Sequence, residues 1–425
     1  MLIALATIFI LAYAAIALEH PLGINKSASA LIGAGLLWTL YATAMHDPAT
    51  VNHQLEESVA STAQIVFFLI GAMTIVEVID AHNGFEVITA VIRTRSQITL
   101  IWLIGFVTFF LSAILDNLTT TIVMVSLIQK LIGERSDRLL FASLIVIAAN
   151  AGGAWTVIGD VTTTMLWIGG QVTPVNIMGA LILPSLVNLL VPLGIVSYSL
   201  RGKLIAPIVR DAGQSKVDPF ERNLMFGLGL GILIAVPAFK TITHLAPFMG
   251  ILFGLGILWM VGEIVHRHKD EDDRRPLTLV HALTRIDMTA IVFFVGILLA
   301  VAALEHAGML AMLARWLEAS IGRHDVIVIL LGLLSAVIDN VPLVAATMGM
   351  YELKQFPPDS FIWEFIAYCA GTGGSILIIG SAAGVAAMGL EKIEFLWYAR
   401  RIGGLALLGY LAGAGVYIAQ YAITQ

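Results

Sequence analysis

The sequence contains 425 residues, of which 59% are hydrophobic and 12% charged, with a formal net charge of −6. Soluble domains carry about 25% charged residues, and no soluble fold has enough interior to bury this much apolar surface, so we expect an all-α polytopic membrane protein. The one cysteine, Cys369, excludes an intramolecular disulfide and a thiolate metal cluster, and we expect no nucleic-acid partner.

Apolar runs follow one another along the whole chain. The first, residues 2–17, lacks the basic leader of a signal peptide and is expected to be a membrane helix. A single span needs about 20 residues. The runs lie at residues 2–17, 27–44, 59–80, 97–132, 139–169, 174–200, 221–238, 246–265, 286–304, 325–351, 360–390 and 394–419.

Four of these runs are too long for one straight helix, and each is interrupted by an acidic or glycine-rich segment. Such interruptions predict half-helices, which surround the site in many transporters. We expect re-entrant hairpins at 97–132 and 325–351 and broken helices at 139–169 and 360–390. The interrupting segments are Asp116-Asn117, Asn150-Ala-Gly-Gly153, Asp339-Asn340-Val-Pro342 and Gly371-Thr-Gly-Gly374.

The two halves of the chain resemble each other. Leu111-Ser-Ala-Ile-Leu-Asp-Asn117 matches Leu334-Ser-Ala-Val-Ile-Asp-Asn340 at an offset of 223 residues, and Ala149-Asn-Ala-Gly-Gly153 matches Ala370-Gly-Thr-Gly-Gly374 at an offset of 221. Matches in the same order at nearly the same offset predict a duplicated unit. We expect a first repeat at 1–201, a cytoplasmic linker at 202–220 and a second repeat at 221–425.

The basic residues predict the orientation. With two hairpins and the N-terminus outside, four of the 23 Lys and Arg residues lie outside and the other 19 inside, as the positive-inside rule requires. A full crossing at 97–132 would move the basic loops 201–222 and 267–285 outside. The count therefore predicts inverted repeats, with hairpin 97–132 entering from the cytoplasm and hairpin 325–351 from outside. We expect a multi-pass protein of a bacterial inner membrane with both termini outside.

Three aspartates, Asp116, Asp160 and Asp339, lie well inside apolar runs. A charged side chain at the bilayer centre costs about 2.5–3.5 kcal/mol on insertion scales. Because basic residues are nearly absent from the spans, we expect a proton or a metal cation, not a structural ion pair, to neutralise these carboxylates. A carboxylate that holds either one but not both couples two ion fluxes. The neighbouring hydroxyl and amide oxygens suit Na⁺, since hard cations prefer oxygen ligands.

The two halves differ at Asp160, which aligns with Ser381 at the offset of 221. Duplication explains the pair Asp116 and Asp339 but not Asp160. We therefore expect Asp116 and Asp160 to be the main carboxylates, with Asp339 completing a shared or second site. A structural interpretation stays open, in which these aspartates only cap half-helices.

At these residues the sequence resembles the NhaD family of sodium/proton antiporters, within a superfamily that also holds arsenite pumps and sodium/dicarboxylate symporters. The resemblance is most specific at Glu77-Val-Ile-Asp-Ala-His82, Leu115–Thr120, Gly159–Thr163 and Ile338–Asn340. It implies exchange of Na⁺ or Li⁺ for protons in membrane lipid by alternating access, no enzyme activity, no cofactor and a homodimer.

The resemblance also implies a set of site residues. Na⁺ is expected at Asp116, Asn117, Asp160, Thr163 and Asp339. Glu77 and His82 are candidates for pH sensing or coupling, although an interfacial charge and a helix-end histidine are the plainer interpretations. The full cation- and proton-binding set is Asp116, Asn117, Thr120, Asn150, Asp160, Thr162, Thr163, Ser335, Asp339, Asn340, Thr372 and Ser375.

Three other functions are alternatives to this one. An arsenite exporter would tolerate the carboxylates, whereas a sodium-coupled anion symporter would not, because acidic hairpin tips repel anionic substrates. An intramembrane aspartyl protease also sets two aspartates side by side. Asp160 follows Val157-Ile-Gly159, which lacks the Gly-x-Gly-Asp of such proteases, and a third aspartate would have no role.

Overall fold

The computed structural model describes residues 1–89, 94, 96–200 and 218–424, and every regular element within these ranges is a helix. The predicted all-α membrane fold is therefore confirmed. Seven helical stretches of the described chain are long and apolar enough to span a membrane. They are α3 (Lys26–Met45), α4 (Pro48–Ala81), α10 (Pro174–Ser199), α11 (Pro219–Thr243), α12 (Pro247–His266), α15 (Met288–His306) and the stretch formed by α21 (Phe395–Tyr398), a π-helical turn (Ala399–Gly403) and α22 (Gly404–Thr424).

The four long apolar runs are interrupted, as predicted, and each forms two half-helices. Two of the interruptions begin later than expected, because Gly152, Gly153 and Gly373 are still helical. Glycine keeps the helical hydrogen bonds while allowing a neighbour to approach, so it does not by itself end a helix. The pairs are α6 (Gln97–Ser112) with α7 (Asn117–Leu131), α8 (Arg135–Gly153) with α9 (Val161–Ile168), α17 (His324–Leu334) with α18 (Asn340–Met350), and α19 (Phe361–Gly373) with α20 (Ala382–Glu391).

Each second half-helix begins at a capping side chain. Asp116, Asp160 and Asp339 cap α7, α9 and α18, and Ser381 caps α20. Each cap accepts a hydrogen bond from a backbone N–H of the first turn, a group that has no partner within the helix. The aspartates therefore do cap half-helices. Whether they also bind ions depends on the groups that surround each carboxylate.

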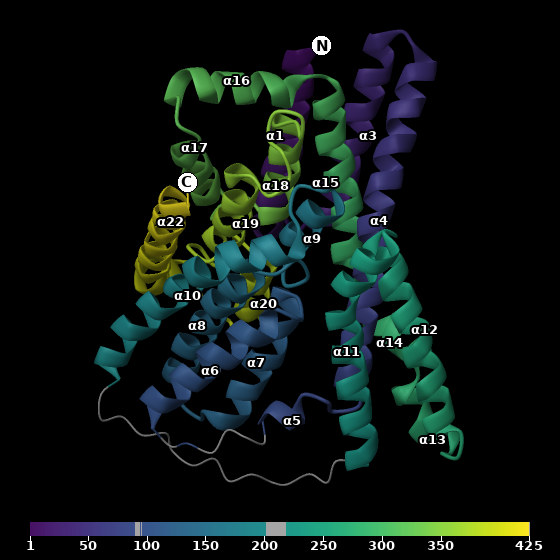
Figure 1. Ribbon diagram of the computed structural model, residues 1–425, viewed down its shortest axis with the longest axis vertical. Helices are drawn as coiled ribbons and strands as arrows, with labels where there is room; N and C mark the ends of the chain where they lie inside the picture. Colours follow the sequence, from purple (N-terminus) through teal and green to yellow (C-terminus); the bar gives the residue numbers. More distant parts are fainter. Residues whose placement is uncertain (90–93, 95, 201–217, 425) are drawn as a thin grey trace.

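The half-helices of the two hairpins lie in different parts of the molecule. Figure 1 shows α6 and α7 in its lower half and α17 and α18 in its upper half, with α16 lying across the upper end. The predicted linker lies outside the described residues except for 218–220, and α11 already begins at Pro219. The inverted-repeat organisation stays a prediction. The remaining helices are α1 (Leu2–Ala17), α2 (Glu19–Leu22), α5 (Glu86–Thr89), α13 (Glu271–Arg274), a 3₁₀ turn (Arg275–Leu277), α14 (Leu279–Arg285) and α16 (Met309–Ile321).

Glycines allow the half-helices to pack closely, and the two halves use them in the same way. A Cβ atom at Gly152 of α8 would lie 2.2 Å from the carbonyl oxygen of Phe109 in α6. A Cβ atom at Gly373 of α19 would lie 2.0 Å from the carbonyl oxygen of Gly332 in α17. These contacts recur at the offsets seen in the sequence, so the duplicated segments make equivalent contacts.

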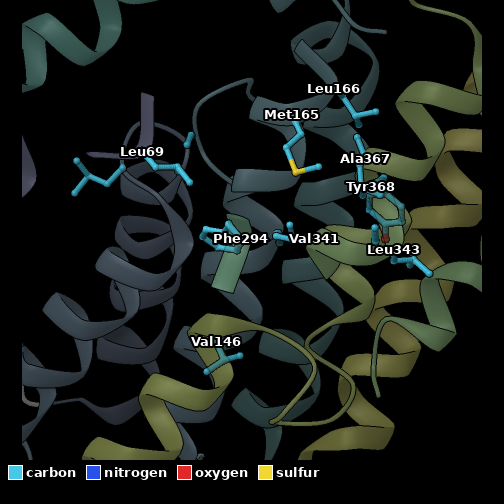
Figure 2. Close-up of a cluster of buried hydrophobic side chains, with 14 of the residues drawn as sticks. Leu69, Val146, Met165, Leu166, Phe294, Val341, Leu343, Ala367 and Tyr368 are labelled. Carbon is cyan, nitrogen blue, oxygen red and sulfur yellow. The ribbon is translucent and has the colours of Figure 1, made fainter. Parts of the chain in front are cut away.

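Apolar side chains from many helices fill the space around the interruptions. Figure 2 shows Leu69 of α4, Phe294 of α15, Met165 of α9, Val341 of α18 and Val146 of α8 within one buried cluster. Within this packing the half-helix ends are held in place, and their polar side chains are buried with them.

Candidate ion-binding site

The carboxylate of Asp160 lies at the centre of the buried polar residues. Asp160 is only 2% exposed, and its Oδ1 accepts a hydrogen bond from the backbone N–H of Thr162 at 2.9 Å. Its Oδ2 accepts from the side-chain amide of Asn117 at 2.7 Å and from that of Asn340 at 3.2 Å. The two asparagines of the duplicated Asp-Asn motif therefore converge on the one aspartate that has no counterpart in the other half.

Asn150 connects this centre to the second half of the chain. Its Oδ1 accepts from the Asn117 amide at 3.0 Å, and its own amide donates to Ser375 at 2.8 Å and to Ser381 at 2.9 Å. Asn150 is fully buried. The sequence interpretation omitted Ser381, although its alignment with Asp160 was the signal that could have found it.

Replacing Asn150 by leucine is expected to destabilise the protein by about 2–4 kcal/mol, because it leaves three buried polar groups without their partner. Thermal unfolding of the purified protein, followed by tryptophan fluorescence, measures the change. Replacing the exposed Asn52 of α4 by leucine is the control and should leave the transition in place. Equal stability of both variants would show that the Asn150 network contributes little to the fold.

The duplicated aspartates themselves lie beside this centre. Both oxygens of Asp116 accept hydrogen bonds from Thr119, from the backbone N–H at 2.8 Å and from the hydroxyl at 2.6 Å. An oxygen of Asp339 lies 3.5 Å from the ammonium of Lys26. The expectation that no structural ion pair would neutralise the aspartates is therefore wrong for Asp339. Lys26 opens α3, and its contact with residue 339 is set by tertiary packing that no local pattern reveals.

The predicted hydroxyl ligands fall into three groups. Thr120 and Thr162 have buried hydroxyl oxygens without a hydrogen-bond partner among the described residues. The hydroxyls of three others donate to backbone carbonyls: Thr163 to Asp160, Ser335 to Ala370 and Thr372 to Tyr368. The hydroxyl of Ser375 accepts from the Asn150 amide.

A cavity of about 1340 Å³ reaches this cluster. Asp116, Asn117, Asp160 and Asp339 all line it. Its wall continues past Glu77 and Asp80 at the end of α4 to the exposed Lys130 and the half-buried Arg222. Water and small ions can therefore reach all three aspartates from one end of the molecule.

Glu77 and His82 lie apart from the Asp160 centre. Glu77 forms an ion pair with Arg285, with 2.7 Å between Oε1 and Nε. This pair supports the interpretation of Glu77 as a charge near the helix end. His82 is buried and its Nε2 lies 3.1 Å from Nε2 of His266, with the rings stacked.

Comparisons with known proteins place the chain among membrane transporters. A family model described as "Citrate transporter" matches residues 13–365. "Sodium/proton antiporter 1" of Arabidopsis thaliana is 51% identical, over 98% of this chain and 72% of the relative. "Na(+)/H(+) antiporter NhaD" of Vibrio cholerae is 31% identical over 97% of this chain and 90% of the relative, and that of Alkalimonas amylolytica is 30% identical over 97% and 89%.

Proposed function

Because this chain belongs to the NhaD family of sodium/proton antiporters, we propose that it exchanges Na⁺ or Li⁺ for protons across its membrane. The observation that carries the proposal is the environment of Asp160. This carboxylate is buried, it lines a large cavity, and none of the ion pairs among the described residues includes it. A buried carboxylate needs a neutralising partner, and a proton and Na⁺ can each supply one.

The exchange rests on competition at Asp160. A carboxylate that has bound Na⁺ cannot be protonated, and a protonated one is a poor cation ligand. Asn117 and Asn340 position the carboxylate, and the hydroxyls of Thr120 and Thr162 offer further oxygen ligands. Asp116 lines the same cavity and acts as the second carboxylate of the site.

Alternating access supplies the vectorial step. The positive-inside count assigns α13 and the end of α4 to the cytoplasmic side, so the cavity is open to the cytoplasm in this conformation. The opposite opening would expose Asp160 to the outside. Figure 1 has both chain termini in the upper half of the molecule and α13 at its lower end, which supports termini on the outer side. We further propose that the protein acts as a homodimer.

The match to a citrate-transporter model raises the alternative of a carboxylate substrate. Three aspartates and one lysine line the inner cavity around the half-helix ends. A negatively charged substrate would meet net negative charge there, which costs free energy at short range. The Asp160 centre therefore favours a cation as the transported species.

Everted membrane vesicles from an antiporter-deficient host test the proposal. Adding Na⁺ or Li⁺ to respiring vesicles should release protons from the vesicle interior, seen as dequenching of a ΔpH-sensitive dye. Vesicles with empty vector are the control. If citrate uptake occurs and neither Na⁺ nor Li⁺ moves protons, the antiporter proposal fails and the symporter alternative replaces it.

Competition also predicts a pH dependence. Lowering the pH should raise the apparent KM for Na⁺ by up to about tenfold per unit, because the ligand must be deprotonated to bind the cation. The rate at saturating Na⁺ should change much less. Na⁺ titrations of the dye response at several pH values measure both quantities. An apparent KM that does not vary with pH would contradict competition for one site.

A further inference from the structure

Lys26 forms an ion pair with Asp339, the aspartate of the second Asp-Asn motif. Its ammonium lies 3.5 Å from Asp339 and 4.4 Å from the centre of the Phe293 ring. The Lys26 side chain is 23% exposed and that of Asp339 is 15% exposed. An ion pair in this partly buried position is held more firmly than one on a surface, because solvent screens it less.

The local structure fixes Lys26 at this place. It is the first residue of α3, whose N-cap is Asn25, and its backbone N–H donates to the carboxylate of Glu19 at 3.1 Å. The aromatic face of Phe293 on α15 gives the ammonium a second favourable contact. The packing of α3 against α15 thus holds Lys26 beside both Phe293 and Asp339.

The corresponding position in the other half has no basic residue. Gly35-Leu-Leu-Trp38 of α3 matches Gly256-Ile-Leu-Trp259 of α12, and at that offset Lys26 aligns with Pro247. None of the ion pairs among the described residues includes Asp116. Among the described residues, one duplicated aspartate is therefore paired with a lysine, whereas the other accepts its hydrogen bonds from Thr119.

We propose that Lys26 is a tethered counter-cation that reserves Asp339, so that the second Asp-Asn pair does not hold transported Na⁺ in this conformation. The proposal rests on the proposed exchange of Na⁺ for protons and deepens it. Asn340 still serves the Asp160 centre, whereas its neighbour Asp339 is neutralised by the protein itself. Na⁺ then has Asp116 and Asp160 as its carboxylates.

The charge of the pair has a direct consequence for Na⁺ affinity. In Asp339→Asn the Lys26 charge is left uncompensated beside the cavity and repels Na⁺. In Lys26→Gln the Asp339 charge is released and attracts Na⁺. Charges a few ångströms from a partly desolvated site interact strongly enough to change an affinity by about fivefold or more. In the double variant both charges are gone and the two effects cancel.

The test compares wild type, Lys26→Gln, Asp339→Asn, the double variant and Lys26→Arg as purified protein in proteoliposomes. The apparent KM for Na⁺ is measured from Na⁺-driven proton flux, and Na⁺-dependent thermal stabilisation reports binding without transport. We expect KM to rise about fivefold in Asp339→Asn, to fall about as much in Lys26→Gln, and to return to near the wild-type value in the double variant. Lys26→Arg keeps the charge and should behave as wild type.

Two results would overturn the proposal. A double variant as weak in Na⁺ binding as Asp339→Asn would make Asp339 itself a Na⁺ ligand. A Lys26→Gln protein with unchanged Na⁺ binding would show that Lys26 does not reserve the carboxylate. The proposed function fails separately, if wild-type protein moves no protons in response to Na⁺ or Li⁺.

Discussion

Asp160→Asn is expected to abolish Na⁺-driven proton exchange, with at least about a hundredfold loss of rate. An amide carries no charge for Na⁺ and cannot take up the transported proton. It also brings an NH₂ group to the place where Asn117 and Asn340 both donate to Oδ2, so one oxygen must serve all the donors or a donor must face another donor. The measurement is Na⁺-dependent dye dequenching in everted vesicles at matched expression.

A matched control shows whether the effect comes from losing the charge of Asp160 or from losing any carboxylate charge that caps a helix. Asp47 caps α4 at an exposed position, where it accepts hydrogen bonds from Thr50. Asparagine caps helices as well as aspartate does, so Asp47→Asn should retain exchange. Robust exchange in Asp160→Asn would contradict the central role of the unmatched aspartate. It would indicate that the duplicated aspartates are the main ion-binding carboxylates.

The sequence predicted the parts of the site that depend on local pattern. The lengths of the apolar runs predicted the helical class and the four interruptions. The alignment of the two halves showed that Asp160 has no acidic counterpart in the second half. That alignment also contained Ser381, which sequence reasoning placed opposite Asp160 without assigning it to the site. Its contact with Asn150 is a tertiary feature, and an alignment alone does not show it.

The parts that were not predicted depend on contacts between distant segments. The contact of Lys26 with Asp339 joins the start of α3 to the interruption between α17 and α18, which are far apart in the sequence. Asn117 and Asn340 were expected among the cation- and proton-binding residues, but their convergence on Asp160 was not predicted. A residue at N1 of a half-helix points differently from its N-cap neighbour, and only the tertiary packing of α7 and α18 decides which group each asparagine meets.

Gly373→Ala is expected to destabilise the protein by about 3 kcal/mol and to lower the yield of folded transporter, because overpacking a close backbone contact forces the helices apart. The added Cβ atom would lie 2.0 Å from the carbonyl oxygen of Gly332. A backbone oxygen cannot rotate away as a flexible side chain can, so α17 and α19 must separate. Thermal unfolding in detergent and size-exclusion chromatography measure the effect.

The first half of the chain contains the equivalent close contact, at Gly152. Gly152→Ala should have a similar effect, since its Cβ atom would meet the carbonyl oxygen of Phe109 at 2.2 Å. Gly389 of α20 has nothing within 4 Å of an added Cβ, so Gly389→Ala is the control and should be neutral or slightly stabilising, as alanine favours a helix. If Gly373→Ala and Gly152→Ala unfold like the control, the hairpins do not depend on close packing against the broken helices. Loss of stability in both would show that the equivalent close contacts of the two halves contribute alike to the stability of the fold.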